Sequence, residues 1–159
     1  MVIREAVAED WAWINANADA VGGPQVVSNS TLHTLADYPA GIAVTDDSPI
    51  GFVVYIPEPP ECELLAINVV TQYLGVGSKL MGWAEQQALQ QNCTRMWLAT
   101  TNDNLDALRF YQRRGYRLCE LHRDAFADVL AQKGLNPKQR VEGNYNIIIH
   151  DELILEKTL

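Results

Sequence analysis

The sequence lacks the features of a membrane-spanning or secreted protein. Its 159 residues contain no apolar run that approaches the roughly 20 residues needed to cross a bilayer. The first residues, Met1–Glu5, have none of the basic start, apolar middle and small-residue cleavage site of a signal peptide. We therefore expect a cytoplasmic protein without a membrane partner.

Cysteine and histidine are too scattered for a metal centre. Cys62, Cys93 and Cys119 form neither a CxxC pattern nor a disulfide framework, and they stand in apolar surroundings. The histidines are isolated from one another, so they provide no ligand spacing. We expect buried thiols and no bound metal.

Positive charge is also scarce, with 12 Lys and Arg residues against 20 Asp and Glu residues and a net charge of -8. This balance opposes broad attraction to nucleic acid or anionic membranes, and it weakly favours a cationic substrate. The chain length and the 48% hydrophobic content suit one globular domain over residues 1–159.

Strand and helix patterns alternate along the chain, which predicts an α/β (α+β) protein. Strand patterns lie at residues 2–7, 41–45, 50–56, 61–70, 95–100, 116–121 and 146–155. Helical patterns lie at residues 8–18, 78–91, 104–114 and 124–133. Residues 21–37 are expected to form a loop with a short helix at 31–36. Residues 41–56 are expected to form an antiparallel hairpin.

A glycine-containing turn joins the strand at 61–70 to the helix that follows. It reads Gln72, Tyr73, Leu74, Gly75, Val76, Gly77 and Ser78. The first amides of a helix have no acceptor inside the helix and lie at the positive end of its dipole, so they can bind a diphosphate. Glycines at this point allow the ligand to approach the backbone.

Two other phosphate loops do not fit this turn. The Walker pattern ends in Gly-Lys-Ser/Thr, whereas this sequence has Gly77, Ser78 and Lys79 in that order. The dinucleotide fingerprint needs a third glycine at the position of Leu80. The pattern Gln/Arg-x-x-Gly-x-Gly/Ala remains, and residues 72–77 satisfy it.

A second motif stands one strand later in the chain. It reads Asn104-x-x-Ala107-x-x-Phe110-Tyr111-x-x-x-Gly115-Tyr116. The two motifs, in this order, resemble those of the GCN5-related N-acetyltransferase (GNAT) superfamily. The resemblance implies a single N-acetyltransferase domain over residues 1–159. It also implies a central mixed, mostly antiparallel sheet of about seven strands, with a splayed central pair and helices on both faces.

The resemblance further implies acetyl-CoA as co-substrate. The amides of the turn would bind its diphosphate, and the main chain of Ile67 and Val69 would pair with the pantetheine arm. The amide of Ile67 would also stabilise the oxyanion. Asn104 would contact the pantetheine or the thiol in addition to capping its helix. Together these residues are Ile67, Val69, Gln72, Tyr73, Leu74, Gly75, Val76, Gly77, Ser78, Asn104 and Tyr111.

Three side chains are candidates for proton transfer. Tyr111 resembles the family residue that protonates the departing thiolate, and its alternative role is packing beside Phe110. Glu61 and Glu63 lie on one face of their strand, because strand side chains alternate with period two. Either is a candidate base for the amine, and either is alternatively a solvated charge at the start of the strand.

The sequence departs from the family pattern at two places. Val69 stands where the family usually has proline, and Tyr73 and Leu74 replace a pair that commonly includes a basic residue. The diphosphate thereby loses a nearby cation, for which Lys79, Arg109 and Arg113 are possible substitutes.

These features predict transfer of an acetyl group to a primary amine of a small molecule or peptide. Direct attack in a ternary complex is expected, because neither motif places a cysteine or serine beside a base. The alternative is a catalytically weak CoA-binding sensor or interaction module, and a third reading is transfer of a longer acyl group. Residues 21–39 and the chain after Leu121 would set the acceptor. A homodimer through the last strand is implied by the resemblance and by the tendency of edge strands to pair.

Overall fold

The computed structural model describes residues 1–70 and 75–159. The chain divides into two compact units, of which the first comprises residues 1–26, 33–96 and 159 and the second residues 27–32 and 97–158. The strands are β1 (Val2–Glu5), β2 (Gln25–Ser28), β3 (Thr31–Thr34), β4 (Ala40–Thr45), β5 (Ser48–Glu58), β6 (Glu61–Val69), β7 (Arg95–Thr101), β8 (Arg117–His122) and β9 (Glu152–Thr158). The helices are α1 (Trp11–Ala16), α2 (Val76–Gln90), α3 (Leu105–Gln112) and α4 (Phe126–Gln132).

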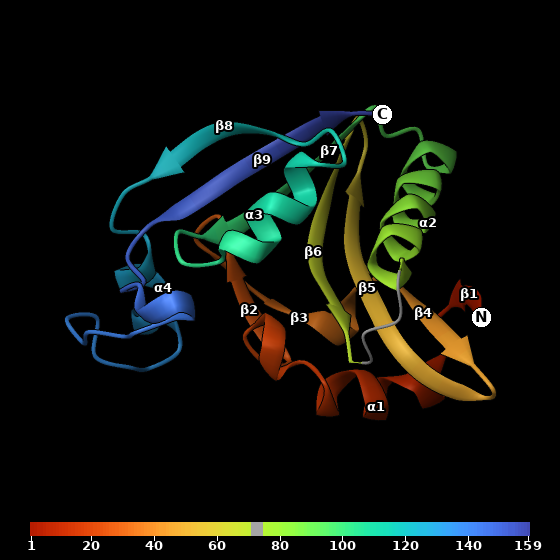
Figure 1. Ribbon diagram of the computed structural model, residues 1–159, viewed down its shortest axis with the longest axis horizontal. Helices are drawn as coiled ribbons and strands as arrows, with labels where there is room; N and C mark the ends of the chain where they lie inside the picture. The colour runs from red at the N-terminus through yellow and green to blue at the C-terminus, as the bar shows by residue number, and fades with distance from the viewer. Residues whose placement is uncertain (71–74) are drawn as a thin grey trace. The chain divides into compact units, whose positions relative to one another are not determined.

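The predicted fold class is confirmed. The main sheet has seven strands in the order β1-β4-β5-β6-β7-β9-β8, and β2 and β3 form a small sheet of two strands (Figure 1). The pairs β1–β4, β4–β5, β5–β6 and β8–β9 are antiparallel. The splay of a central strand pair stays a prediction, as does the assignment of residues 1–159 to one domain.

The first unit contains the predicted hairpin of β4 and β5. Its turn residues Asp46 and Asp47 have φ values of 46° and 59°. Two consecutive positive φ values match the twist of the flanking strands, and aspartate tolerates this conformation better than most residues. The turn therefore sets the pairing of Thr45 with Ser48, and an irregularity between Ala43 and Val44 shifts the register by one residue before Ala40 pairs with Val54.

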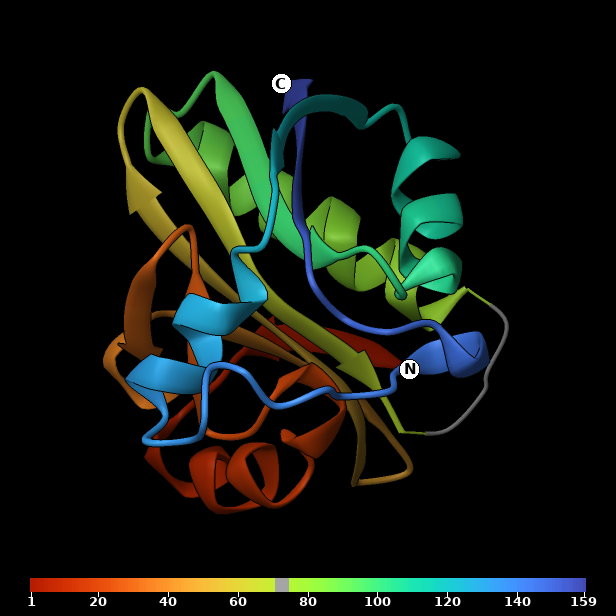
Figure 2. The ribbon, with the colours of Figure 1, turned by 90° about the vertical axis from the view of Figure 1, so that its left-hand side faces the viewer.

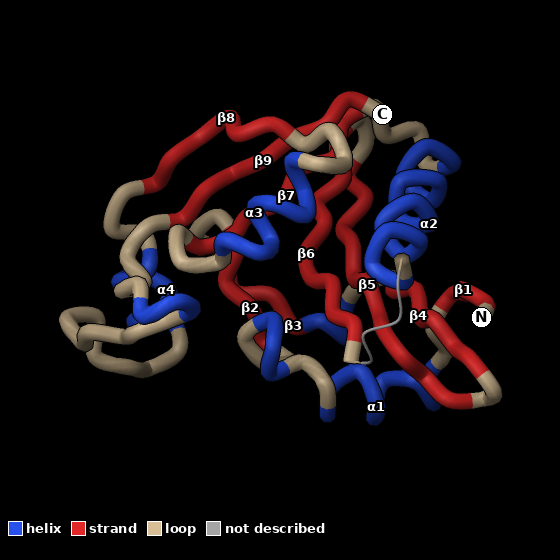
Figure 3. Tube along the Cα trace, viewed as in Figure 1, coloured by secondary structure: helices blue, strands red, loops and turns tan. Residues whose placement is uncertain are grey.

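Helices contact both faces of the sheet in the first unit (Figure 3). On one face, Ile14 of α1 belongs to a buried cluster with Phe52 and Val54 of β5. On the other face, Trp83 of α2 meets the ring of Tyr55 edge-on, with 6.0 Å between ring centroids. A Cβ at Gly41 would collide with the ring of Trp83, so glycine is required for the close approach of α2 to β4.

The second unit contains β8 and β9 side by side, together with α3, α4 and a long connection from α4 to β9 (Figure 2). Helix α3 ends before Gly115, whose φ of 89° is the left-handed conformation predicted for this glycine. Strand β8 has an irregularity between Leu118 and Glu120, so Cys119 stands outside the regular pairing with β9.

Three local predictions are wrong. Residues 31–34 form β3 instead of a helix, because their partner is β2; only Leu35–Asp37 form a helical turn. The last strand begins at Glu152 instead of residue 146, since Tyr145 and Asn146 have positive φ values that exclude a strand. Cys119 is exposed, in contrast to the buried Cys62 and Cys93.

The edge strand of the second unit is also different from the expected one. Strand β9 lies between β7 and β8, so the last strand in sequence is not at the edge of the sheet. Within residues 1–70 and 75–159, no helix is long and apolar enough to cross a membrane.

Candidate functional site

The glycine turn leads into α2 as predicted, although Gln72, Tyr73 and Leu74 lie outside the described residues. Gly75 has a φ of 93° and accepts the first helical hydrogen bond, from the Lys79 amide at 3.0 Å. The amides of Val76 and Gly77 precede that bond, so they have no acceptor inside the helix. Because the Val76 side chain is buried, the start of α2 is anchored while its amides can bind an anion.

Strand β6 presents the predicted main-chain groups on the edge opposite β5. The Val70 amide donates to the Ile50 carbonyl at 3.0 Å, so these two residues are a hydrogen-bonded pair. Pairs alternate along an antiparallel ladder, and Val69 opposite Gly51 and Ile67 opposite Val53 are therefore non-hydrogen-bonded pairs. The N–H and C=O groups of Ile67 and Val69 consequently point away from β5.

A bulge interrupts β6 that the sequence analysis does not predict. Val54 pairs with Ala66 and Tyr55 pairs with Leu64, which leaves Leu65 as an extra residue outside the ladder. The bulge lies two residues before Ile67, within the segment predicted to hold the reacting end of the co-substrate. The bulge changes the direction of the backbone at this point.

The two candidate bases differ in their surroundings. Their predicted common face agrees with the register, in which Glu61 pairs with Glu58 and Glu63 pairs with Ile56. Glu61 is half exposed and forms an ion pair with Arg95 at 2.7 Å. Glu63 is only 7% exposed. The ion pair suits the alternative reading of Glu61 as a charge at the strand entry, whereas Glu63 is the stronger candidate for proton transfer.

A histidine and a tyrosine that the sequence reading did not select lie on this face. His33 Nδ1 is 2.8 Å from the hydroxyl of Tyr38, and the two rings meet edge-on at 5.4 Å. Burial raises the pKa of Tyr38, and the charges of Asp37, Glu63 and Glu58 raise it further. His33 is therefore not isolated; its partner lies five residues away, across a turn that the sequence did not predict.

Tyr111 lies in the second unit and is buried. Its ring contacts those of Phe110 and Tyr116, with centroid distances of 5.4 Å and 6.0 Å. Burial raises the pKa of Tyr111 to about 12, so the phenol keeps its proton at neutral pH. The residue has the packing role of its alternative reading, and its catalytic role stays a prediction.

Asn104 occupies the N-cap position of α3, but its side chain does not cap the helix. Its carbonyl accepts a hydrogen bond from the Leu108 amide at 3.0 Å, and its side-chain Nδ2 donates to Thr100 Oγ1 at 3.1 Å. The predicted side-chain cap is thus wrong, because the amide is turned toward β7. Its proposed contact with the co-substrate is untested.

A buried aspartate orders the backbone near Asn104. Asp103 is 2% exposed and accepts hydrogen bonds from the Thr101 hydroxyl at 2.5 Å and from the Asn144 amide and side chain, both at 2.9 Å. Three donors satisfy the carboxylate, so its burial is tolerated. Asp103 thereby fixes the connection that precedes β9.

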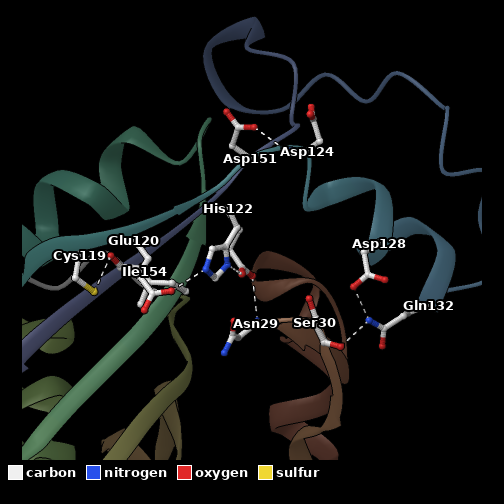
Figure 4. Close-up of polar contacts among 11 residues, drawn as sticks. Asn29, Ser30, Cys119, Glu120, His122, Asp124, Asp128, Gln132, Asp151 and Ile154 are labelled. Carbon is white, nitrogen blue, oxygen red and sulfur yellow. Dashed lines mark hydrogen bonds and ion pairs between the residues drawn. The ribbon is translucent and has the colours of Figure 1, made fainter.

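His122 forms a second polar cluster within the second unit (Figure 4). Its Nε2 is 2.8 Å from Glu120, and its Nδ1 is 3.1 Å from Glu152. Hydrogen bonds to these two carboxylates raise the pKa of His122. Glu152, which is 7% exposed, also accepts a hydrogen bond from the Asn29 amide at 3.2 Å. The cluster ties a turn of the chain to β9.

No group of three or more His, Cys, Asp and Glu side chains within the described ranges 1–70 and 75–159 is arranged to hold a metal ion. Of the cations considered for the diphosphate, Arg109 is exposed and lies 4.0 Å from Asp106. This distance and exposure describe a surface ion pair.

The comparisons with known proteins define the class. The family model of the acetyltransferase (GNAT) family matches residues 7–116. The chain therefore belongs to the GNAT acetyltransferase family.

Individual proteins resemble this chain in sequence or in fold. The uncharacterized protein YxbD of Bacillus subtilis (strain 168) is 35% identical over 139 residues, which cover 87% of this chain and 86% of YxbD. A GNAT family acetyltransferase from Elizabethkingia anophelis, solved with acetyl-CoA bound, has a TM-score of 0.73 at 18% identity and covers 99% and 97% of the two chains. The ribosomal-protein-alanine N-acetyltransferase from Brucella melitensis has a TM-score of 0.68 at 17% identity, with complete coverage of both chains.

Proposed function

We propose that this chain is a single N-acetyltransferase domain that transfers an acetyl group from acetyl-CoA to a primary amine of a small molecule or peptide. The observation that carries the proposal is the edge of β6, where Ile67 and Val69 direct main-chain groups away from β5 shortly before the turn at Gly75. Strand β7 follows β6 on this side in the sheet order, so pairing of an extended ligand with Ile67 and Val69 requires the predicted splay of the two strands. The phosphates of the ligand would then reach the helix start.

The residues that are described fit acetyl-CoA. At Gly75, no atom of residues 1–70 or 75–159 lies within 4 Å of the position that a Cβ would occupy, so the described part of the chain leaves room for a ligand there. The amides of Val76 and Gly77 would bind the diphosphate together with Ser78 and with the turn residues before Gly75. The solved relative from Elizabethkingia anophelis binds acetyl-CoA, which supports the same co-substrate here.

The chemistry needs one proton acceptor and one proton donor. A primary amine is protonated near neutral pH, and Glu63 on β6 would take a proton before attack. Tyr111 would give its proton to the departing sulfur, and its raised pKa keeps that proton in place until a strong base forms. Attack would be direct, in a ternary complex of chain, acetyl-CoA and amine.

The acceptor is proposed to be cationic. The net charge of -8 favours approach of a positively charged molecule. The related enzyme from Brucella melitensis acts on ribosomal-protein alanine by its name, which supports a peptide amine as one candidate. Neither nucleic acid nor a metal takes part in the proposed reaction.

We further propose a cytoplasmic location and a possible homodimer. Three thiols without a disulfide suit a reducing compartment. Strand β8 forms the edge of the sheet and exposes Leu118 by 52% and Leu121 by 55%. This strand, and not β9, is the surface that a second copy would cover.

One observation favours the alternative of a catalytically weak CoA-binding sensor or interaction module. The ring of Tyr111 contacts two other aromatic rings, and a residue that serves packing alone would make the same contacts. A longer acyl group is the remaining alternative for the donor.

The test combines binding and turnover. Calorimetry with acetyl-CoA is expected to show binding, and an assay of free thiol over a panel of amines is expected to show turnover. Tyr111→Phe should bind acetyl-CoA normally and turn over slowly. Binding without turnover on any amine would support the sensor, and absence of binding at millimolar acetyl-CoA would overturn the proposal.

A further inference from the structure

Tyr38 and Glu63 lie on the same face at one end of the sheet in the first unit. Ala40 pairs with Val54, and the Tyr55 amide donates to the Pro39 carbonyl at 3.2 Å, so the β4–β5 pairing continues back toward Tyr38. Tyr38 itself is extended, with φ −125° and ψ 157°. It therefore stands beside Ile56, whose partner on β6 is Glu63.

Opposite residues of antiparallel strands share a face, so the phenol ring projects on the side that carries Glu63. The effect of the Glu63 charge on Tyr38 agrees with this placement. Glu63 precedes the bulged residue Leu65 by two positions and Ile67 by four. Tyr38 consequently belongs to the surroundings of the candidate base.

The hydroxyl of Tyr38 is joined to an imidazole that can accept a proton. The distance of 2.8 Å to His33 Nδ1 is a short hydrogen bond. Burial lowers the pKa of His33, so the ring is neutral at pH 7 and one nitrogen has a lone pair. In the tautomer protonated at Nε2, the phenol donates to Nδ1.

A second proton acceptor has a chemical purpose in N-acetyl transfer. An ammonium group loses two protons on its way to an amide, one before the nitrogen can attack and one as the new bond forms. Glu63 can take the first. A carboxylate that has taken one proton is a poor acceptor for the next.

We propose that Tyr38 and His33 accept the second proton of the acceptor amine, an inference that rests on the function proposed above. As the N–C bond forms and the C–S bond breaks, the proton leaves nitrogen for Tyr38 Oη while the proton of Tyr38 passes to His33 Nδ1. Sulfur receives a proton from Tyr111. Of the two protons that leave the amine, one restores Tyr111 through solvent and the other is released.

Charges around the imidazole are suited to this step. Glu58 at the end of β5 favours the protonated form of His33, and so opposes the effect of burial. Asp37 and Glu63 are the other acidic groups that act on Tyr38. The imidazolium formed during the reaction is thus stabilised by carboxylates, while the resting ring stays neutral.

The test uses Tyr38→Phe and His33→Gln in the full chain, with Tyr55→Phe as the matched control. Tyr55 is another tyrosine of the first unit; unlike the partly buried Tyr38 it is fully buried, and its ring contacts Trp83 on the opposite face. Tyr38→Phe and His33→Gln should each lower kcat by about 10²-fold, the usual contribution of a proton-transfer group. Binding of acetyl-CoA by calorimetry and the thermal unfolding temperature should remain those of the unchanged chain.

Two further readouts separate proton transfer from packing. The double variant should lose no more activity than either single variant, because the two residues act as one unit. The acid limb of the kcat–pH profile should have an apparent pKa below about 6.5, the usual histidine value. The position of this limb should change in His33→Gln, because the histidine no longer contributes to it.

The outcomes distinguish this inference from the proposed function. Unchanged kcat in Tyr38→Phe, losses that multiply in the double variant, or an acid limb whose position is the same in His33→Gln as in the unchanged chain would each overturn the role of the pair alone. If the unchanged chain releases no thiol with any amine, the proposed function fails first, and the proton-accepting role fails with it.

Discussion

Each unit of the chain contains a buried glutamate and a histidine, but the surroundings shift the pKa values of the two histidines in opposite directions. In the first unit, His33 bonds to the phenol of Tyr38, and burial lowers its pKa. In the second, His122 contacts Glu120 and Glu152, which raise its pKa. A neutral ring can accept a proton, whereas a charged ring holds carboxylates. The surroundings of each histidine, rather than the residue type, therefore determine whether its ring is suited to proton transfer or to a structural role.

The glutamates show the same contrast. Glu152 is engaged by His122 and by the Asn29 amide, which suits a structural role. Glu63 is equally buried, at 7%, but stands on the strand that carries the candidate co-substrate edge. If the contrast holds, substitution of Glu63 or His33 lowers turnover, whereas substitution of Glu152 or His122 lowers stability.

The largest effect is expected for Glu63→Gln. Loss of the first proton acceptor should lower kcat by about 10³-fold, or about 4 kcal/mol of transition-state stabilisation, while acetyl-CoA still binds. Stopped assays of thiol release, together with calorimetry, measure the two quantities. Glu61→Gln is the matched comparison, because it removes a carboxylate of the same face that already pairs with Arg95. A greater loss in Glu61→Gln would reverse the assignment of the base.

The next effect is on stability, for Asp103→Ala in the second unit. The change removes a buried acceptor and leaves the Thr101 hydroxyl and the Asn144 donors without it, so the free energy of unfolding should fall by about 3 kcal/mol. Urea denaturation provides the measurement. Asp106→Ala is the control, since Asp106 is 69% exposed in its side chain, accepts a hydrogen bond from the Tyr145 hydroxyl and lies 4.0 Å from Arg109. Equal losses of unfolding free energy in both variants would show that burial of the carboxylate does not determine the size of the loss.

A smaller loss of stability is expected in the first unit, for Gly41→Ala. The added methyl group meets the ring of Trp83, so α2 must shift, and overpacking of this kind typically costs about 1–3 kcal/mol. Gly82→Ala is the control, because nothing lies within 4 Å of its added Cβ and alanine favours a helix. Urea midpoints that move equally would contradict the close approach of α2 to β4.

Much of this arrangement could be predicted from local patterns. The hairpin over Asp46 and Asp47, the turn at Gly75 and the helix end at Gly115 follow from residues that determine their own backbone conformation. Strand β6 and helix α2 follow from periodicity. The motifs that contain Gly75 and Gly115 also carry the family resemblance, which the family model confirmed.

The rest depends on contacts between residues distant in sequence. The apolar residues after Asn146 look like a strand, yet Asn102 accepts from the His150 and Asp151 amides at 2.9 Å and 3.0 Å and holds the segment outside the sheet. The bulge at Leu65 depends on the register between β6 and β5, which the amino-acid composition of β6 does not reveal. His33 was read as isolated because its partner Tyr38 follows a turn that was expected to be helical.

The smallest expected effect is the pH dependence of stability that His122 contributes. Its folded pKa is raised above the unfolded value of about 6.5, so the contribution is fully present below that pH. It is lost as pH rises through the folded pKa, because the deprotonated ring no longer attracts Glu120 and Glu152. We expect His122→Gln to cost less than about 1 kcal/mol at pH 6, and less still at pH 9, in urea denaturation. His33→Gln should show the opposite trend, because burial lowers the pKa of His33. The stability that the neutral ring contributes is present at high pH and is lost as pH falls. If the free energy of unfolding of the two variants changed with pH in the same direction, the distinction between a structural and a proton-accepting histidine would be lost.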